Sequence, residues 1–148
     1  MRYPRLFQPL QIRHVRFRNR IFSAPVQTSY LDGMGYYTDY AIEYFAEKAR
    51  GGAALVTAGD TPVDGRYAAA TYRHPVLDDP GTLPSLCELV GAVHEYGAMV
   101  SVELNHAGSM AHPQYITGPS PIGPVDYLRK DGQPIKGMDG ELMAYTLD

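Results

Sequence analysis

The chain has 148 residues, enough for one domain with a substantial core. Its formal net charge of -3 at pH 7 and its pI of about 5.9 provide no basic surface for nucleic acid or for an anionic membrane. A single cysteine, Cys87, excludes an internal disulfide, and no apolar run approaches the roughly 20 residues that cross a bilayer. The first residues also lack the apolar core of a signal peptide, so we expect a cytoplasmic protein.

Short alternating runs open the chain. Leu10–Ile12 and Val15–Phe17 alternate apolar and polar residues, which predicts a small β-hairpin of half-buried strands. Residues 21–24 are more apolar and are expected to form the first core strand. Pro25 is expected to end that strand, because proline has no N–H to donate to a sheet.

An amphipathic helix is predicted next, with Thr38 or Asp39 as its N-terminal cap. Its apolar residues recur at the spacing of one helix face: Ile42, Phe45, Ala46 and Ala49. Two glycines, at residues 51–52, are expected to end this helix. The apolar run at residues 53–58 then predicts a strand buried on both faces, as in parallel sheets.

A second helix has the same apolar spacing, and Gly97 follows its last turn. Its apolar stripe consists of Leu86, Leu89, Val90 and Val93. Cys87 lies beside this stripe and is expected to be a small buried side chain. Residues 99–104 form a third predicted strand. The order of strand, helix, strand, helix and strand predicts right-handed βαβ units, a parallel sheet and the α/β class.

The last third of the chain is rich in proline and glycine. Residues 112–124 are expected to form a long surface loop, and the Asp-Gly pair at residues 131–132 predicts a two-residue hairpin turn. Residues 140–148 are expected to begin another helix. Three strands do not close a barrel, so the open sheet edge predicts pairing with a second copy or with a complementing C-terminal half.

Several segments, taken in order, resemble the old yellow enzyme family, in its NADH:flavin oxidoreductase and 2,4-dienoyl-CoA reductase branch. The order and spacing of the segments carry the resemblance together. They are residues 6–10, 19–21, 24–27, 54–61, 94–97, 103–108 and 118–120. The resemblance implies that residues 1–148 are a single partial (β/α)₈ TIM-barrel domain, the N-terminal part of the barrel. Residues 1–20 would be a hairpin plugging the bottom, 21–108 the first three strands and two helices, and 109–148 a long loop, a hairpin and the start of the next helix.

The resemblance also implies a reaction. FMN would lie across the C-terminal mouth of the barrel, where it accepts hydride from NAD(P)H and passes it to a small-molecule alkene such as an enone or an enoyl thioester. The family's proton donor comes from strands beyond residue 148, so no catalytic residue is assigned. The phosphate site also comes from late strands, and a 4Fe-4S cluster is implied only if a longer parent chain exists.

Two other interpretations stay open. In the first, the chain is a truncated, non-catalytic fragment or pseudo-domain that pairs with another chain. In the second, it is part of an unrelated (β/α)₈ enzyme such as an aldolase or a glycosidase. The second interpretation is weaker, because such an enzyme needs a lysine or a carboxylate pair at strand ends. Only Asp60 and Glu103 are available there.

Seven residues at predicted strand ends are candidates for binding the cofactor: Ala24, Pro25, Val26, Gln27, Gly59, Asp60 and Glu103. The small residues Ala24 and Gly59 would allow a ligand to approach the backbone. Gln27 is either an ordinary loop residue or a contact to the flavin edge near N5 and O4.

Glu103 stands where many family members carry glutamine. An ionised carboxylate accepts from flavin N3–H but cannot donate to O2. Glu103 is therefore protonated by burial, bonded to N3–H alone, or a strand-end glutamate in water.

The remaining histidines and tyrosines give weaker signals. His106 is expected to orient its loop, and Ser109 stands where the family motif usually has arginine. No metal-ligand spacing links the other histidines to Cys87 or to a carboxylate, and we expect surface or helix positions for His14, His74 and His94. Three tyrosines after the first strand either line a substrate pocket or lie in a surface loop: Tyr30, Tyr36 and Tyr37.

Overall fold

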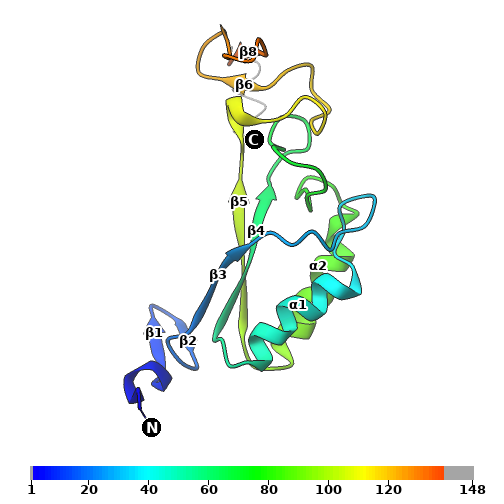
Figure 1. Cartoon of the computed structure of the whole chain (residues 1–148). Coiled ribbons are helices and arrows are strands. Elements are labelled where there is room, and N and C mark those ends of the chain that lie inside the picture. Colours follow the sequence, from blue (N-terminus) through cyan, green and yellow to red (C-terminus); the bar gives the residue numbers. More distant parts are fainter. Residues whose placement is uncertain (1, 139–148) are drawn as a thin grey trace.

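The structure, a computed structural model, describes residues 2–138 (Figure 1). Strands β3 (Phe22–Val26), β4 (Leu55–Pro62) and β5 (Met99–Asn105) form a parallel sheet in that order. Helices α1 (Asp39–Arg50) and α2 (Thr82–His94) connect the strands and cover the same face of the sheet. The predicted α/β class and parallel sheet are confirmed. No helix within the described residues is long and apolar enough to cross a membrane.

The core lies between the two helices and the sheet. Of the predicted inward-facing residues, Ile42 and Leu86 are half-buried and pack against the core, and Val90 is half-buried outside it. The others are buried: Phe45, Ala46, Ala49, Leu89 and Val93. Thr38 caps α1, because its Oγ1 accepts a hydrogen bond from Ala41 N–H at 3.4 Å. The prediction that Cys87 is buried is wrong: it is exposed. Cys87 is two residues before Leu89, which turns it roughly 200° around the helix and away from the core.

Both pairings in the sheet contain a β-bulge near the carboxyl ends of the strands. Between β3 and β4 the register runs from Ser23↔Val56 to Val26↔Ala58, which leaves one extra residue in β3. Pro25 lies in this irregular stretch, so its missing N–H breaks no regular pairing. The prediction that Pro25 ends the strand is therefore wrong, since β3 continues to Val26.

The second bulge lies in β4. Its register to β5 runs from Ala58↔Val102 to Thr61↔Leu104, so that Gly59 and Asp60 make up the irregular stretch. The two bulges lie side by side on neighbouring strands. Bulges bend a strand and redirect its side chains, and they are common at barrel rims and beside active sites.

The predicted N-terminal hairpin is confirmed as β1 (Leu10–Ile12) and β2 (Val15–Phe17), which pair antiparallel after the short 3₁₀ helix η1 (Pro4–Phe7). Figure 1 shows the hairpin at the end of the sheet where the parallel strands begin. Arg18, directly after β2, attaches it to the rest of the fold.

The Arg18 guanidinium donates to three main-chain carbonyls, one in the last turn of α1 and two in the segments that follow α1 and α2. Its Nη2 lies 2.7 Å from Ala49 O and 2.7 Å from Ala53 O, and its Nη1 donates to Tyr96 O. The last carbonyls of a helix lack intrahelical partners and carry partial negative charge. One arginine therefore links the hairpin to the segments that leave both helices, and it adds a second donor to Ala49 O, which also accepts from Gly52 N–H.

The last described segment forms a small three-stranded sheet with β8 (Pro134–Gly137) between β6 (Ile122–Gly123) and β7 (Tyr127–Leu128). The predicted hairpin is confirmed between β7 and β8, but the prediction of a two-residue turn is wrong. The loop has three residues, because Arg129 N–H donates to Gln133 O.

Residues 112–124 are less loop-like than predicted, because they include β6 and bury Ile116 against Ala69 and Ala111. A short 3₁₀ helix, η2 (Gly108–Met110), precedes them. The helix predicted at residues 140–148 lies outside the described residues.

Candidate functional site

The predicted cofactor residues all lie at the carboxyl ends of the three parallel strands, at the end of the sheet opposite the N-terminal hairpin. We call residues 24–27, 59–60 and 103 the strand-end ledge. Ala24, Pro25, Gln27 and Glu103 are exposed there. In parallel α/β barrels the carboxyl ends of strands are the usual place of the active site. The ledge is therefore the candidate functional site of the chain.

Gly59 allows β3 and β4 to approach each other closely. A Cβ at this position would lie 2.6 Å from Val26 N, 2.9 Å from Val26 C and 3.0 Å from Pro25 C. Any side chain would therefore displace the backbone of β3. The space that the sequence suggested for a ligand beside Gly59 is occupied by the neighbouring strand, so Gly59 shapes the ledge from within.

Asp60 connects β4 to β5. Its backbone has a φ of +52°, a left-handed conformation that costs free energy for a residue other than glycine. The Asp60 N–H donates to Glu103 Oε2 at 3.0 Å, and its carboxylate accepts a hydrogen bond from Asn105 Nδ2. These two bonds hold the strained residue in place and fix the Glu103 side chain on the ledge.

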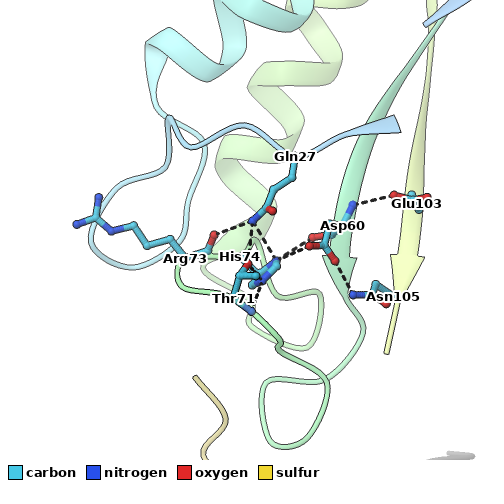
Figure 2. Close-up of polar contacts among 7 residues, drawn as sticks. All are labelled: Gln27, Asp60, Thr71, Arg73, His74, Glu103 and Asn105. Carbon is cyan, nitrogen blue, oxygen red and sulfur yellow. Dashed lines mark hydrogen bonds and ion pairs between the residues drawn. The ribbon is translucent and has the colours of Figure 1, made fainter. Parts of the chain in front are cut away.

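His74 lies beneath the ledge, in the segment that connects β4 to α2. It is only 4% exposed, so the prediction of a surface or helix position is wrong. Its Nδ1 lies 3.0 Å from Asp60 O, and its Nε2 accepts from Thr71 N–H at 3.1 Å (Figure 2). The loop after β3 packs against this segment closely, since a Cβ at Gly35 would collide with the His74 carbonyl.

Gln27 extends from the end of β3 toward the same segment. Its Nε2 lies 3.4 Å from Thr71 Oγ1 and 3.5 Å from Arg73 O. Figure 2 shows a continuous set of polar contacts that runs from Gln27 through His74 and Asp60 to Glu103. Residues that are far apart in the sequence, predicted separately, thus form one connected site.

Glu103 is exposed, so the burial that would favour a protonated carboxyl is missing in this structure. Its Oε2 is engaged by the Asp60 N–H, and within the described residues Oε1 has no hydrogen bond. The side chain can therefore accept a hydrogen bond from a ligand through Oε1. An ionised carboxylate cannot donate one.

The other candidates take structural positions. His106 accepts from Gly108 N–H at 3.0 Å through Nδ1, as expected of a residue that orients its own loop. Tyr37 lies in the core, and burial raises the pKa of its phenol to about 12. Tyr36 donates to Asp79 Oδ2 at 2.9 Å, whereas Tyr30 is exposed. Among residues 2–138 no three His, Cys, Asp or Glu side chains gather as a metal site would require.

The chain belongs to the NADH:flavin oxidoreductase / NADH oxidase family, whose model matches residues 5–143. The resemblance of its sequence segments predicted this flavin oxidoreductase family, and the fold of the chain is that of old yellow enzymes.

Three known proteins illustrate the relationship. NADH oxidase from Thermoanaerobacter brockii is 33% identical over 125 residues, which cover 82% of this chain and 19% of that protein. A 2-naphthoyl-CoA reductase complex superposes with a TM-score of 0.82 at 26% identity, over 98% of this chain and 24% of the other. Old yellow enzyme from Pichia sp. AKU4542 superposes with a TM-score of 0.83 at 17% identity, over 96% of this chain and 39% of that enzyme. The chain thus spans about a fifth of the length of the curated NADH oxidase.

Proposed function

We propose that this chain supplies one wall of the flavin site in an FMN-dependent NAD(P)H oxidoreductase of the ene-reductase type. The observation that carries the proposal is the strand-end ledge, where one polar network that runs through Thr71, His74 and Asp60 holds Gln27 at the end of β3 and Glu103 on β5. When bound, FMN would relay hydride from NAD(P)H to an activated C=C bond. The protein's part is to hold and orient the flavin ring and to tune its electronics.

The residues of the ledge fit the edge of a flavin ring. A flavin presents an N–H donor at N3, and Glu103 Oε1 is an exposed acceptor without a partner among the described residues. The exposed stretch at Ala24 and Pro25 lets a flat ring approach the end of β3. Gln27 would contact the ring near N5 and O4. We assign no catalytic acid to this chain, since the family's proton donor would come from later strands.

We further propose that β3, β4 and β5 are the first three strands of a (β/α)₈ barrel. Both helices cover one face of the sheet, and the other face remains open (Figure 1). In a barrel, that open face would look into the interior and meet the remaining strands. Residues 1–20 would then close the bottom of the barrel, residues 21–108 would supply three strands and two helices, and residues 109–148 would supply a long loop, a hairpin and the start of the next helix.

The substrate class follows from chemistry and from one relative. An activated alkene, such as an enone or an enoyl thioester, accepts hydride at the carbon β to its carbonyl group. The name of the 2-naphthoyl-CoA reductase, which is 26% identical to this chain, describes a thioester substrate. This supports a thioester in preference to a simple enone.

The alternative function is that of a non-catalytic fragment that pairs with another chain. It is favoured by the outer strands β3 and β5, each of which pairs on one side only within the described residues. Unpaired strand edges are templates for association.

Absorbance spectra of the purified chain with added FMN, recorded alongside size-exclusion chromatography, distinguish the two functions. We expect weak FMN binding that perturbs the flavin spectrum, because the family's phosphate site lies in late strands. A Glu103→Gln variant should still bind. A protein that leaves the FMN spectrum unchanged at saturating concentrations would contradict the flavin proposal and favour the fragment.

A further inference from the structure

His74 is the one buried histidine of the described chain, and the resemblance to known enzymes assigned it no role. Its side chain is 1% exposed and lies between the end of β4 and the loop that follows β3. Every polar contact that it makes is to a residue of the ledge or to Thr71. A buried imidazole with contacts at both nitrogens has a defined orientation.

The hydrogen bonds determine which nitrogen carries the proton. Thr71 N–H can only donate, and it lies 3.1 Å from Nε2, so Nε2 is an acceptor without a proton. In a neutral imidazole the proton is then on Nδ1, which faces the Asp60 carbonyl at 3.0 Å. The Asp60 carbonyl can only accept, so the contacts at both ring nitrogens require the same tautomer, with the proton on Nδ1.

This tautomer acts on Gln27 through Thr71. Because Nε2 carries no proton, the Thr71 hydroxyl donates to it at 2.5 Å, and Thr71 Oγ1 is then left to accept from the Gln27 amide at 3.4 Å. Arg73 O is a second acceptor for the same NH₂ group, whereas the 3.4 Å contact of Gln27 Nε2 with the protonated Nδ1 joins two donors. Gln27 Oε1 has no hydrogen bond within the described residues. The carbonyl oxygen, and not the NH₂ group, is therefore the part of Gln27 that is available to a ligand.

The His74 ring also contacts the part of the ledge that holds Glu103. Nδ1–H of His74 holds the carbonyl of Asp60, the strained residue whose N–H binds Glu103. The ledge thus presents two acceptors, Gln27 Oε1 and Glu103 Oε1. A ligand edge that carries N–H donors complements such a surface, whereas an edge of acceptors does not.

We propose that His74 is a positioning residue that gives the strand-end ledge its acceptor character, by directing the Gln27 carbonyl outward and by holding Glu103 through Asp60. The identity of the ligand rests on the proposed function: flavin N3–H would donate to Glu103, and N5–H, which only the reduced flavin carries, would donate to Gln27 Oε1. The orientation of Gln27 does not rest on that function, because it follows from contacts within this chain.

The first test uses NMR of the ¹⁵N-labelled chain without any ligand. We expect the His74 resonances of the Nδ1–H tautomer, and we expect the Gln27 side-chain NH₂ resonances to shift in His74→Phe. The matched control is His94→Phe, because His94 is exposed at the end of α2 and should leave Gln27 unchanged. An Nε2–H tautomer, or Gln27 resonances that ignore His74→Phe, would overturn the inference.

The second test measures the affinity for reduced FMN, by anaerobic absorbance titration, in a double-mutant cycle of His74→Phe and Gln27→Met. Each change should weaken binding about five- to tenfold, as expected for a hydrogen bond, and the double variant should lose little more than one of them. Independent, multiplicative losses would show that His74 does not act through Gln27. His74→Asn, which keeps a donor near the Nδ1 position, should recover part of the affinity, and it replaces His74→Phe if that variant does not fold.

The two tests separate the inference from the proposed function. If the chain binds no FMN but shows the Nδ1–H tautomer and the coupled Gln27 resonances, the flavin proposal fails and the positioning role of His74 holds. If FMN binds and the tautomer is Nε2–H, the positioning role fails alone.

Discussion

The helix-covered face of the sheet and the strand-end ledge differ in side-chain burial and in backbone regularity. On the covered face, apolar side chains such as Phe45, Leu89 and Val93 are almost fully buried. On the ledge, strands bulge, Asp60 has a left-handed backbone, and polar side chains remain exposed. The comparison shows that stability is concentrated where the sheet is regular, and that the candidate site occupies the part where local structure is costly.

The largest effect is expected on the covered face. Phe45 is 1% exposed and packs edge to face with Tyr37 and Tyr44. Phe45→Ala should lower the free energy of unfolding by about 3–5 kcal/mol through lost burial and a cavity. Tyr40→Ala, which truncates a side chain 79% exposed on the same helix, should change it by less than about 0.5 kcal/mol. Urea unfolding followed by circular dichroism measures both, and similar losses would refute the assignment of the core to this face.

The next effect is expected at the boundary between the two regions. Gly59→Ala would push its Cβ against the backbone of Val26, and backbone cannot rotate away. We expect a loss of about 2–3 kcal/mol, together with weaker FMN binding because both bulges must shift. Gly33→Ala is the matched control, since nothing lies within 4 Å of its Cβ position. Thermal unfolding compares the two variants, and an unchanged midpoint for Gly59→Ala would contradict the close packing of β3 on β4.

A smaller effect is expected at the opposite end of the sheet. Arg18→Ala removes the donor that satisfies carbonyls of Ala49, Ala53 and Tyr96. The side chain is exposed, so we expect a loss of only about 1–2 kcal/mol, with FMN affinity unchanged. Arg18→Lys should recover little, because one ammonium cannot span three carbonyls. Arg16→Ala, which alters an exposed neighbour, serves as the control in the same unfolding assay.

The smallest effect depends on pH. Burial raises the pKa of Tyr37 to about 12, above its value of 10.0 in an unfolded chain. The folded state therefore keeps the phenol proton more tightly, and the stability this provides is complete below pH 10 and is lost as pH rises toward 12. About 1 kcal/mol should disappear by about pH 11 in the wild type relative to Tyr37→Phe. Denaturant titrations at several alkaline pH values test this, and parallel pH profiles for the two proteins would contradict the buried phenol.

The regular elements could be predicted from the sequence because each has a period that reports its environment. The spacing of Phe45 and Ala49 in α1, and of Leu89 and Val93 in α2, identifies the buried helix faces. The alternation in Leu10–Ile12 identifies the hairpin strand. Cys87 shows the limit of this reasoning, since a residue beside an apolar stripe lies on another face of the helix.

The connections within the site could not be predicted in this way. The bulges at Pro25 and Asp60 arise from register between strands, which no single segment encodes. His74 lies in a loop without periodicity, so its burial depends on how that loop packs against Gly35 and Asp60. Seven cofactor residues were proposed from the resemblance, while the residues that hold them, Thr71, His74 and Asn105, carried no signal of their own.

The most direct test of the central claim is a titration of the ¹⁵N-labelled chain with FMN, followed by amide chemical shifts. The account predicts that the largest changes fall at residues 24–27, 59–60 and 103, with smaller ones near His74, and that α1 and the N-terminal hairpin stay unchanged. Changes centred on the helices or the hairpin, or none at saturating FMN, would contradict the claim that the strand-end ledge is a wall of a flavin site.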